Sequence, residues 1–236
     1  TMMAMMAEQQ GLKRWAECTP AHVFHLQQIH QAFPNARFIH MVRDGRDVAM
    51  SLARQKWITP FPWDKKRELA VAALFWQWNV GVGASQAASL GTNYFECRYE
   101  DLVSQPEATL SKLSQFVGAE LDYDWIQANA VGTVQKPNTS FKGKDFRPIG
   151  RWRDGMSADQ VSELESVVGN MLTAKGYELS HESSGARSVN FSRATYKTLW
   201  RFKHWLRSKT FVGRLSSLDL LRSEIVETDR TEVETH

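Results

Sequence analysis

Two arginines and two aspartates directly follow an apolar segment and are the clearest candidates for anion chemistry. Phe38–Val42 is a nearly continuous apolar run, typical of a strand covered on both faces, and the chain then reads RDGRD. At the carboxyl end of a strand, Arg43 can hold an anion together with the free N–H groups of the following helix. Asp44 and Asp47 favour a helix N-terminus, and Asp47 can hold an arginine in place. The same residues also fit a capped helix start with purely structural ion pairs, so both interpretations stay open.

Helical and strand-like segments alternate along the chain. Thr19 and Pro20 fit an N-cap and a first helical residue, and Ser157 with Gln160 has the spacing of a capping box. Strands are predicted at 38–42 and 94–99, and helices after Pro20, after Asp44, at 64–89, up to Gly118 and between Ser157 and Gly176. This order predicts an α/β fold with a parallel sheet covered by helices, whose ligands bind beyond the carboxyl ends of the strands.

The composition is that of a globular protein, with 42% hydrophobic and 23% charged residues. A net charge of +3 does not by itself argue for a nucleic acid partner, and none is expected. Two distant cysteines form no disulfide framework, which favours a reducing, cytoplasmic location. No apolar stretch has the length of a membrane span, and the start lacks the layout of a secretory signal. Because the chain begins with Thr1, we expect a processed or truncated chain.

Four segments resemble, in the same order, motifs of the sulfotransferases, in particular the branch of bacterial and tyrosylprotein sulfotransferases. They are WAECTPAHVFHL (15–26), FPNARFIHMVRDGRDVAMS (33–51), YFECRYEDLVSQPEATLSKLSQFVG (94–118) and GRWRDGMS (150–157). The resemblance implies a P-loop-NTPase-like parallel sheet flanked by helices over residues 15–180. It also implies transfer of a sulfuryl group from 3′-phosphoadenosine 5′-phosphosulfate, without a metal, to a hydroxyl or amine acceptor. Small molecules, saccharides, lipids and peptides are the acceptor classes, and adenosine 3′,5′-bisphosphate is the product.

The resemblance also assigns residues to the nucleotide. Arg43 and Ser51 match the segment that binds the 3′-phosphate, which agrees with the strand-end argument for Arg43. A basic loop precedes the GRWRDG motif, and family members close such a loop over the same phosphate. Arg147 and Lys144 are its candidates, with Arg147 preferred because its guanidinium matches a phosphate bidentately. Trp152 is expected to pack in the core.

Two departures from the family pattern bear on activity. Nothing before residue 15 resembles the family's loop around the 5′-phosphosulfate, so the first strand and helix of the domain are expected to be missing. Cys18 stands where relatives place a lysine, and an ordinary thiol is nearly uncharged at neutral pH. The alternative to an enzyme is therefore a catalytically inactive, sulfotransferase-like binding or membrane-associated module.

Glu17 and His22 are the candidates for acid–base chemistry. Sulfuryl transfer needs a group that removes the acceptor's proton, and related branches use a glutamate in or near the Glu17 segment. Helix capping at Thr19 or pairing with Arg14 is the alternative role of Glu17. His22 falls in the first helical turn after Pro20, which we expect to face the acceptor. The histidines of this region lack the carboxylates or thiols that would complete a metal site.

The last part of the chain, 181–236, is expected to be a helical arm followed by a disordered acidic tail. Residues 187–215 carry many basic side chains and no acidic one, with Tyr196, Leu199, Trp200, Leu206 and Phe211 as an apolar stripe. Such a helix suits an anionic membrane surface or an acidic partner. Packing of the helix against its own domain is the alternative.

Overall fold

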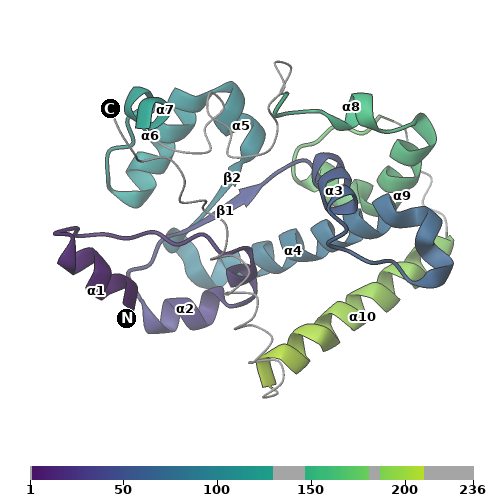
Figure 1. Cartoon of the computed structure of the whole chain (residues 1–236), viewed down its shortest axis with the longest axis horizontal. Coiled ribbons are helices and arrows are strands. Elements are labelled where there is room, and N and C mark those ends of the chain that lie inside the picture. The colour runs from purple at the N-terminus through teal and green to yellow at the C-terminus, as the bar shows by residue number, and fades with distance from the viewer. Residues whose placement is uncertain (1, 130–146, 181–186, 210–236) are drawn as a thin grey trace, which may run out of the picture. The chain divides into compact units, whose positions relative to one another are not determined.

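A computed structural model describes residues 2–129, 147–180 and 187–209, which form helices and a short parallel sheet (Figure 1). The elements are α1 (Met2–Gln9), η1 (Pro20–Phe24), α2 (Leu26–Ala32), β1 (Phe38–Val42), α3 (Gly45–Arg54), η2 (Pro62–Arg67), α4 (Glu68–Leu90), η3 (Gly91–Asn93), β2 (Tyr94–Arg98), α5 (Tyr99–Ser104), α6 (Pro106–Val117), α7 (Tyr123–Asn129), α8 (Trp152–Gly155), α9 (Ala158–Ala174) and α10 (Arg187–Lys209). This order of helices and parallel strands confirms the predicted α/β class.

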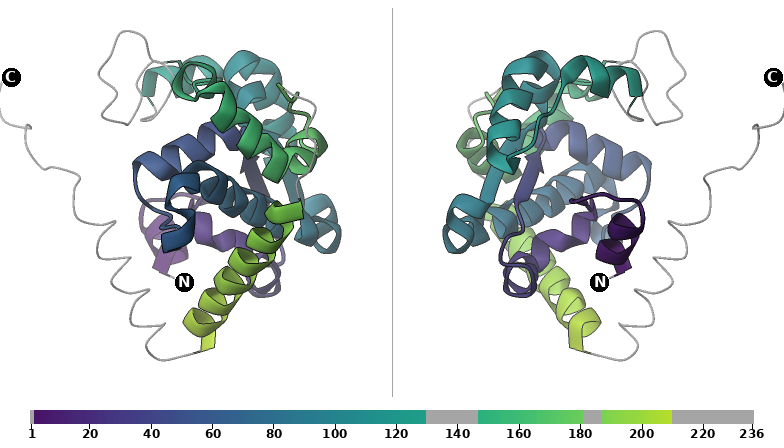
Figure 2. Two further views of the ribbon diagram at one scale, coloured as in Figure 1. Left: turned by 90° about the vertical axis from the view of Figure 1, so that its right-hand side faces the viewer. Right: turned by 90° about the vertical axis from the view of Figure 1, so that its left-hand side faces the viewer.

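The sheet brings two strand ends together. β1 and β2 pair in parallel, from Phe38 opposite Tyr94 to Val42 opposite Arg98, and the two strands run side by side in Figures 1 and 2. Because the pairing is in register, the residues that follow the strands leave the sheet at the same edge. These residues are Arg43, which follows β1 as predicted, and Tyr99, which follows β2 and begins α5. Arg43 and the start of α5 therefore lie at the same end of the sheet.

The chain folds as two compact units. The first consists of Thr1–Val48 with Trp76–Gly155, and the second of Ala49–Phe75 with Met156–His236. The sheet, the predicted acid–base pair and Arg43 all belong to the first unit. The expected division into 15–180 and 181–236 stays a prediction.

β1 is buried on one face rather than on both, so the prediction of two-sided cover was wrong. Ile39 and Met41 are each 44% exposed, whereas Val42 is buried and His40 faces Gly83 of α4. A β-carbon added at Gly83 would lie 2.5 Å from His40 Cε1, which shows how closely α4 approaches this face. The apolar residues on the exposed face of β1 therefore reflect strand propensity and not burial.

A small core beside β2 holds α6 and α7 in the first unit. Cys97, Leu110 and Leu113 are buried there. Burial, with a smaller contribution from Asp101, raises the pKa of the Cys97 thiol, so this side chain packs as an apolar group. Gly118 ends α6 in the left-handed conformation at φ 63°, as its position after the last apolar residue predicts.

α9 and α10 contribute the core of the second unit. Ser157 and Gln160 form the predicted capping box of α9, which buries Val161, Leu164, Val167, Val168 and Leu172. Tyr196 of α10 is buried, and its hydroxyl donates to Asp64 at 2.9 Å and accepts from the Phe61 N–H at 3.0 Å. One face of α10 thus packs on its own unit. The predicted stripe residue Phe211 lies outside the described residues.

In the described part of the chain, no helix combines the length and apolarity needed to cross a bilayer.

Candidate functional site at the carboxyl end of the sheet

Arg43 leaves β1 and is held by partners from distant parts of the chain. Its Nη2 donates to the Pro148 carbonyl at 2.7 Å and lies 3.4 Å from Asp47 Oδ2. The guanidinium carbon lies 4.7 Å from the centre of the Tyr99 ring, within the range of a cation–π contact. These contacts fix the direction of the side chain at the shared edge of the sheet.

The Arg43 guanidinium keeps hydrogen-bonding capacity after these contacts. Both polar contacts use Nη2, and the buried Nε has no hydrogen-bond partner among the described residues. The side chain is 26% exposed, so it is neither sealed in the core nor enclosed by carboxylates. A buried donor without a partner is costly unless a ligand or water satisfies it. The arrangement therefore fits an arginine that binds an anion.

The second arginine of the RDGRD segment has a structural role. Arg46 is buried and pairs with Asp44, with Nη2 and Oδ2 2.8 Å apart, and its guanidinium lies over the Trp152 ring at 3.9 Å. Asp44 caps α3 as predicted, because its Oδ1 accepts from the Arg46 N–H at 2.9 Å. Glu100 accepts from the Asp44 N–H at 2.9 Å, which ties the two strand ends together. The structural interpretation of this segment therefore applies to Arg46, and anion binding by Arg43 stays a prediction.

Asp47 connects α3 to the GRWRDG motif, a connection that sequence reasoning missed. The residue is fully buried, and its Oδ2 and Oδ1 accept from the backbone N–H groups of Gly150 and Trp152, each at 2.9 Å. Gly150 has a φ of 70°, a conformation that favours glycine. Trp152 is buried, as expected. Asp47 thus holds the segment whose Pro148 carbonyl accepts from Arg43.

The remaining nucleotide candidates have other surroundings. Arg147 is well exposed and lies 3.3 Å from Asp154, so its guanidinium points to a carboxylate of its own motif. Ser51 is half-buried on α3. Lys144 lies outside the described residues. The roles of these three residues stay predictions.

Glu17 and His22 lie in contact. The His22 Nδ1 is 2.6 Å from Glu17 Oε2, and the Thr19 hydroxyl donates to Glu17 Oε1. Thr19 precedes η1, a 3-10 turn that brings His22 back toward Glu17. The predicted alternative of pairing with Arg14 is not seen, because Arg14 donates to the Val117 carbonyl at 2.7 Å. Among the described residues, no hydrogen bond or ion pair joins the Glu17–His22 pair to Arg43.

The neighbouring histidines have packing roles or altered basicity. Burial, with a smaller contribution from His22, lowers the pKa of His25. His40 lies on the face of β1 covered by α4, with its Nδ1 2.5 Å from the Tyr94 hydroxyl, and burial raises the pKa of that phenol. The described residues include no group of three or more histidine, cysteine, aspartate or glutamate side chains that could hold a metal.

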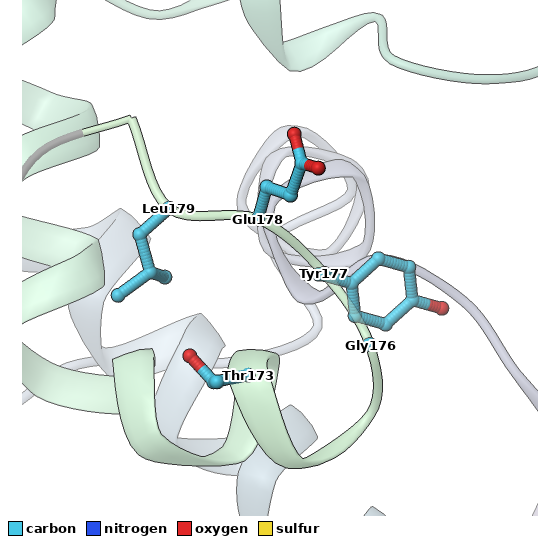
Figure 3. A pocket seen from close by; sticks show the side chains of 5 residues that line it. All are labelled: Thr173, Gly176, Tyr177, Glu178 and Leu179. Atoms are coloured by element: carbon cyan, nitrogen blue, oxygen red, sulfur yellow. The ribbon is translucent and has the colours of Figure 1, made fainter.

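A separate pocket follows α9 in the second unit. It has a volume of about 370 Å³ and is lined by Thr173, Gly176, Tyr177, Glu178 and Leu179. In Figure 3, the Tyr177 hydroxyl and the Glu178 carboxylate do not converge on one point. None of the predicted site residues lines this pocket, and it contributes no cation for a phosphate.

Tyr99 is a further contact of Arg43 that the sequence could have indicated. The RYED segment lies at the end of a predicted strand, and adjacent parallel strands end on the same side of a sheet. The sequence therefore allowed the inference that a residue of this segment lies beside Arg43. The Pro148 carbonyl offered no such signal, because a backbone acceptor leaves no mark in the residue type. It lies 105 residues from Arg43 along the chain.

Comparison with known proteins defines the family. A match to the sulfotransferase family covers residues 1–123, more than half of the chain, so the chain belongs to that family. A sulfotransferase domain from the curacin biosynthetic pathway has a similar structure, with a TM-score of 0.51 and 18% sequence identity over 75% of this chain and 68% of that one. This likeness supports the fold.

Curated relatives include enzymes named for two kinds of acceptor. Protein-tyrosine sulfotransferase A of Caenorhabditis elegans is 25% identical over 64% of this chain and 41% of its own length. Protein-tyrosine sulfotransferase of Drosophila melanogaster is 27% identical over 63% of this chain and 31% of its own. Carbohydrate sulfotransferase 7 of Mus musculus is 29% identical over 47% of this chain and 24% of its own. The chain thus spans less than half the length of each of these three relatives.

Proposed function

We propose that this chain is part of a sulfotransferase that moves a sulfuryl group from 3′-phosphoadenosine 5′-phosphosulfate to a hydroxyl acceptor. The observation that carries the proposal is Arg43, which projects from the carboxyl end of β1 with an unpartnered buried Nε. An oriented guanidinium at this edge of a parallel sheet suits a phosphate. The family membership supports the reaction class, and the names of the relatives support a tyrosine or saccharide hydroxyl as the acceptor.

The residues of the first unit divide the work between binding and proton transfer. When bound, the nucleotide supplies an activated sulfuryl group on its 5′-phosphate. Arg43 holds the 3′-phosphate, and Asp47 holds both Arg43 and the Gly150 segment in position. Arg147 and Lys144 are further candidates for phosphate contacts, and Ser51, a residue of the second unit, stays a predicted contact. Arg147 would have to leave Asp154 to make such a contact.

The Glu17–His22 pair fits the removal of the acceptor's proton. A carboxylate only accepts hydrogen bonds, so in the neutral imidazole the proton lies on Nδ1, facing Glu17, and Nε2 is free to accept. The acceptor oxygen forms the new bond to sulfur while the bond between sulfur and the 5′-phosphate oxygen breaks. The acceptor's proton passes to His22 Nε2, and Glu17 stabilises the resulting imidazolium. In this account His22 is the base and Glu17 its positioning residue.

Calorimetric titration with adenosine 3′,5′-bisphosphate tests the nucleotide site. Loss of a charged hydrogen bond costs about 1.5–3 kcal/mol, so Arg43→Ala is expected to bind roughly 10- to 150-fold more weakly than the wild type. Arg37→Ala is the matched control, since Arg37 precedes β1 at the other end and donates to the Thr92 carbonyl at 3.0 Å. Equal affinity of Arg43→Ala and Arg37→Ala would refute the assignment.

An inactive binding module is the second candidate, and Cys18 favours it. The thiol is exposed beside Glu17 and stands where the sulfotransferases resembled by this chain carry a lysine. Transfer of radiolabelled sulfate to a tyrosine-containing peptide and to a saccharide separates the candidates and the two acceptors. Nucleotide binding without transfer to either acceptor would favour the binding module. Transfer that is lost in His22→Ala would establish the enzyme.

A further inference from the structure

α10 has an outer face that combines exposed aromatic and basic side chains. Phe202 and Trp205 are 53% and 52% exposed, and their rings stack at a centroid distance of 6.0 Å and an interplanar angle of 20°. Trp205 follows the buried Tyr196 by nine residues, which at about 100° per residue places it on the opposite side of the helix. Lys197 and Arg201 are exposed on the same side as Trp205. These four residues, Lys197, Arg201, Phe202 and Trp205, are called the outer face below.

The charge of α10 is of one sign. Its 23 residues, RSVNFSRATYKTLWRFKHWLRSK, include Arg187, Arg193, Lys197, Arg201, Lys203, Arg207 and Lys209 but no aspartate or glutamate. This concentration contrasts with a net charge of only +3 for the whole chain. Lys197, Arg201 and Lys203 are exposed and no acidic residue of the helix neutralises them, so this part of its surface complements an anionic partner.

The opposite face of α10 is anchored, so the outer face has a fixed exposure. Tyr196 hydrogen-bonds to Asp64, and the Trp200 ring packs edge-on against Phe75 at 5.2 Å between centroids. Arg193 donates to the Val167 carbonyl of α9. An amphipathic helix that lacked such an anchor would bury its aromatic residues by rotating. Here rotation would break the Tyr196 contacts, so Phe202 and Trp205 stay about half exposed on the side of the helix away from Tyr196.

We propose that the outer face of α10 binds the surface of an anionic lipid bilayer. Tryptophan and phenylalanine partition into the interfacial region of a bilayer, and flanking lysines and arginines are attracted to anionic headgroups. The Phe202 and Trp205 rings lie 6.0 Å apart between centroids and nearly parallel, so together they present one apolar surface to the interfacial region of a bilayer. The interaction is independent of the sulfotransferase reaction, and it places the second unit of the protein at a membrane surface.

Sedimentation of the full chain with vesicles of phosphatidylcholine containing 30% phosphatidylserine tests the proposal. Each basic residue near an anionic surface is worth about fivefold in partitioning, so Lys197→Gln/Arg201→Gln is expected to bind roughly 25-fold more weakly. Lys13→Gln/Lys112→Gln is the matched control, because both lysines are exposed and lie in the other unit. The control variant removes the same charge and is expected to bind within about twofold of the wild type.

A second pair of variants tests the aromatic contribution. Phe202→Ala/Trp205→Ala is expected to lower partitioning at least about tenfold, whereas Trp125→Ala, which removes a tryptophan that is 65% exposed on α7, is expected to have no effect. Circular dichroism confirms that each variant stays folded. Wild-type protein that does not sediment, that sediments equally with pure phosphatidylcholine, or whose binding survives both double substitutions would overturn the proposal. Binding to an RNA oligonucleotide but not to the vesicles, at the same salt concentration, would also overturn the proposal. The affinity for adenosine 3′,5′-bisphosphate tests the nucleotide site separately, so none of these outcomes decides the proposed function.

Discussion

Substitution of Asp47 by asparagine is expected to release the GRWRDG motif from the sheet. Asp47 is fully buried, and each of its carboxylate oxygens accepts one backbone N–H, from Gly150 and from Trp152, at 2.9 Å. Asparagine has nearly the same shape but only one acceptor oxygen. Whichever way its amide is oriented, the NH₂ group faces one of the two backbone donors. One of these N–H groups therefore loses its acceptor. The neighbouring Arg43 guanidinium also loses the negative charge of the carboxylate that it contacts.

The size of the effect follows from these contacts. A hydrogen bond to a charged group contributes about 1.5–3 kcal/mol, and a buried donor left without a partner adds a desolvation cost. Replacing a buried charge by a neutral amide recovers part of this cost. We expect the free energy of unfolding to fall by about 2–4 kcal/mol in Asp47→Asn. Asp154→Asn is the control, because its side chain is 72% exposed and its ion pair with Arg147 contributes about 0–1 kcal/mol.

Two measurements test the expectation. Urea unfolding gives the loss of stability, and hydrogen exchange of the backbone reports on the Gly150 and Trp152 amides directly. Faster exchange of these amides in Asp47→Asn, with wild-type exchange in Asp154→Asn, is the expected outcome. If Asp47→Asn lost less than about 0.5 kcal/mol, or if the amides kept their protection, the tether would not exist as described.

Two further substitutions probe the two units separately. Gly83→Ala would favour a helix by intrinsic propensity, but we expect a loss of about 1–3 kcal/mol because the new β-carbon meets His40 at 2.5 Å and Val23 at 2.9 Å. Thermal unfolding should show that His40→Ala removes most of this loss, and a gain in stability in the single variant would contradict the packing. Burial raises the pKa of Tyr196 to about 12, so stability that is complete below pH 10 should be lost as the pH rises toward 12, by about 1–3 kcal/mol. Tyr196→Phe should be less stable at pH 7, because Asp64 loses a hydrogen bond, and should lack this alkaline dependence. If Tyr196→Phe lost stability at alkaline pH as the wild type does, the pH dependence would come from another group.

Elements defined by local chemistry were predictable from the sequence. The capping box of Ser157 and Gln160 and the left-handed glycine at 118 depend on residues within one or two turns, and both formed as expected. The burial of β1 was not predictable, because strand propensity alone accounts for apolar residues at both faces. Ile39 and Met41 show that the cover of the second face depends on elements elsewhere in the chain.

The candidate site was predictable in position but not in its contacts. Arg43 could be placed at a strand end because an apolar run precedes it, and Asp44 as a cap because a helix follows. The division between a structural Arg46 and an available Arg43 depends on Trp152 and Pro148, which lie more than 100 residues away. Backbone acceptors and donors carry no sequence signal, so the link from Asp47 to Gly150 could not be inferred from residue types.

The most direct test of the central claim removes the phosphate instead of the arginine. Wild-type protein and Arg43→Ala are each titrated with adenosine 3′,5′-bisphosphate and with adenosine 5′-monophosphate in one buffer. If Arg43 binds the 3′-phosphate, the wild type prefers the bisphosphate by roughly 10- to 150-fold, and the variant loses most of that preference. A preference that is the same in both proteins would show that another group reads the 3′-phosphate and would contradict the account.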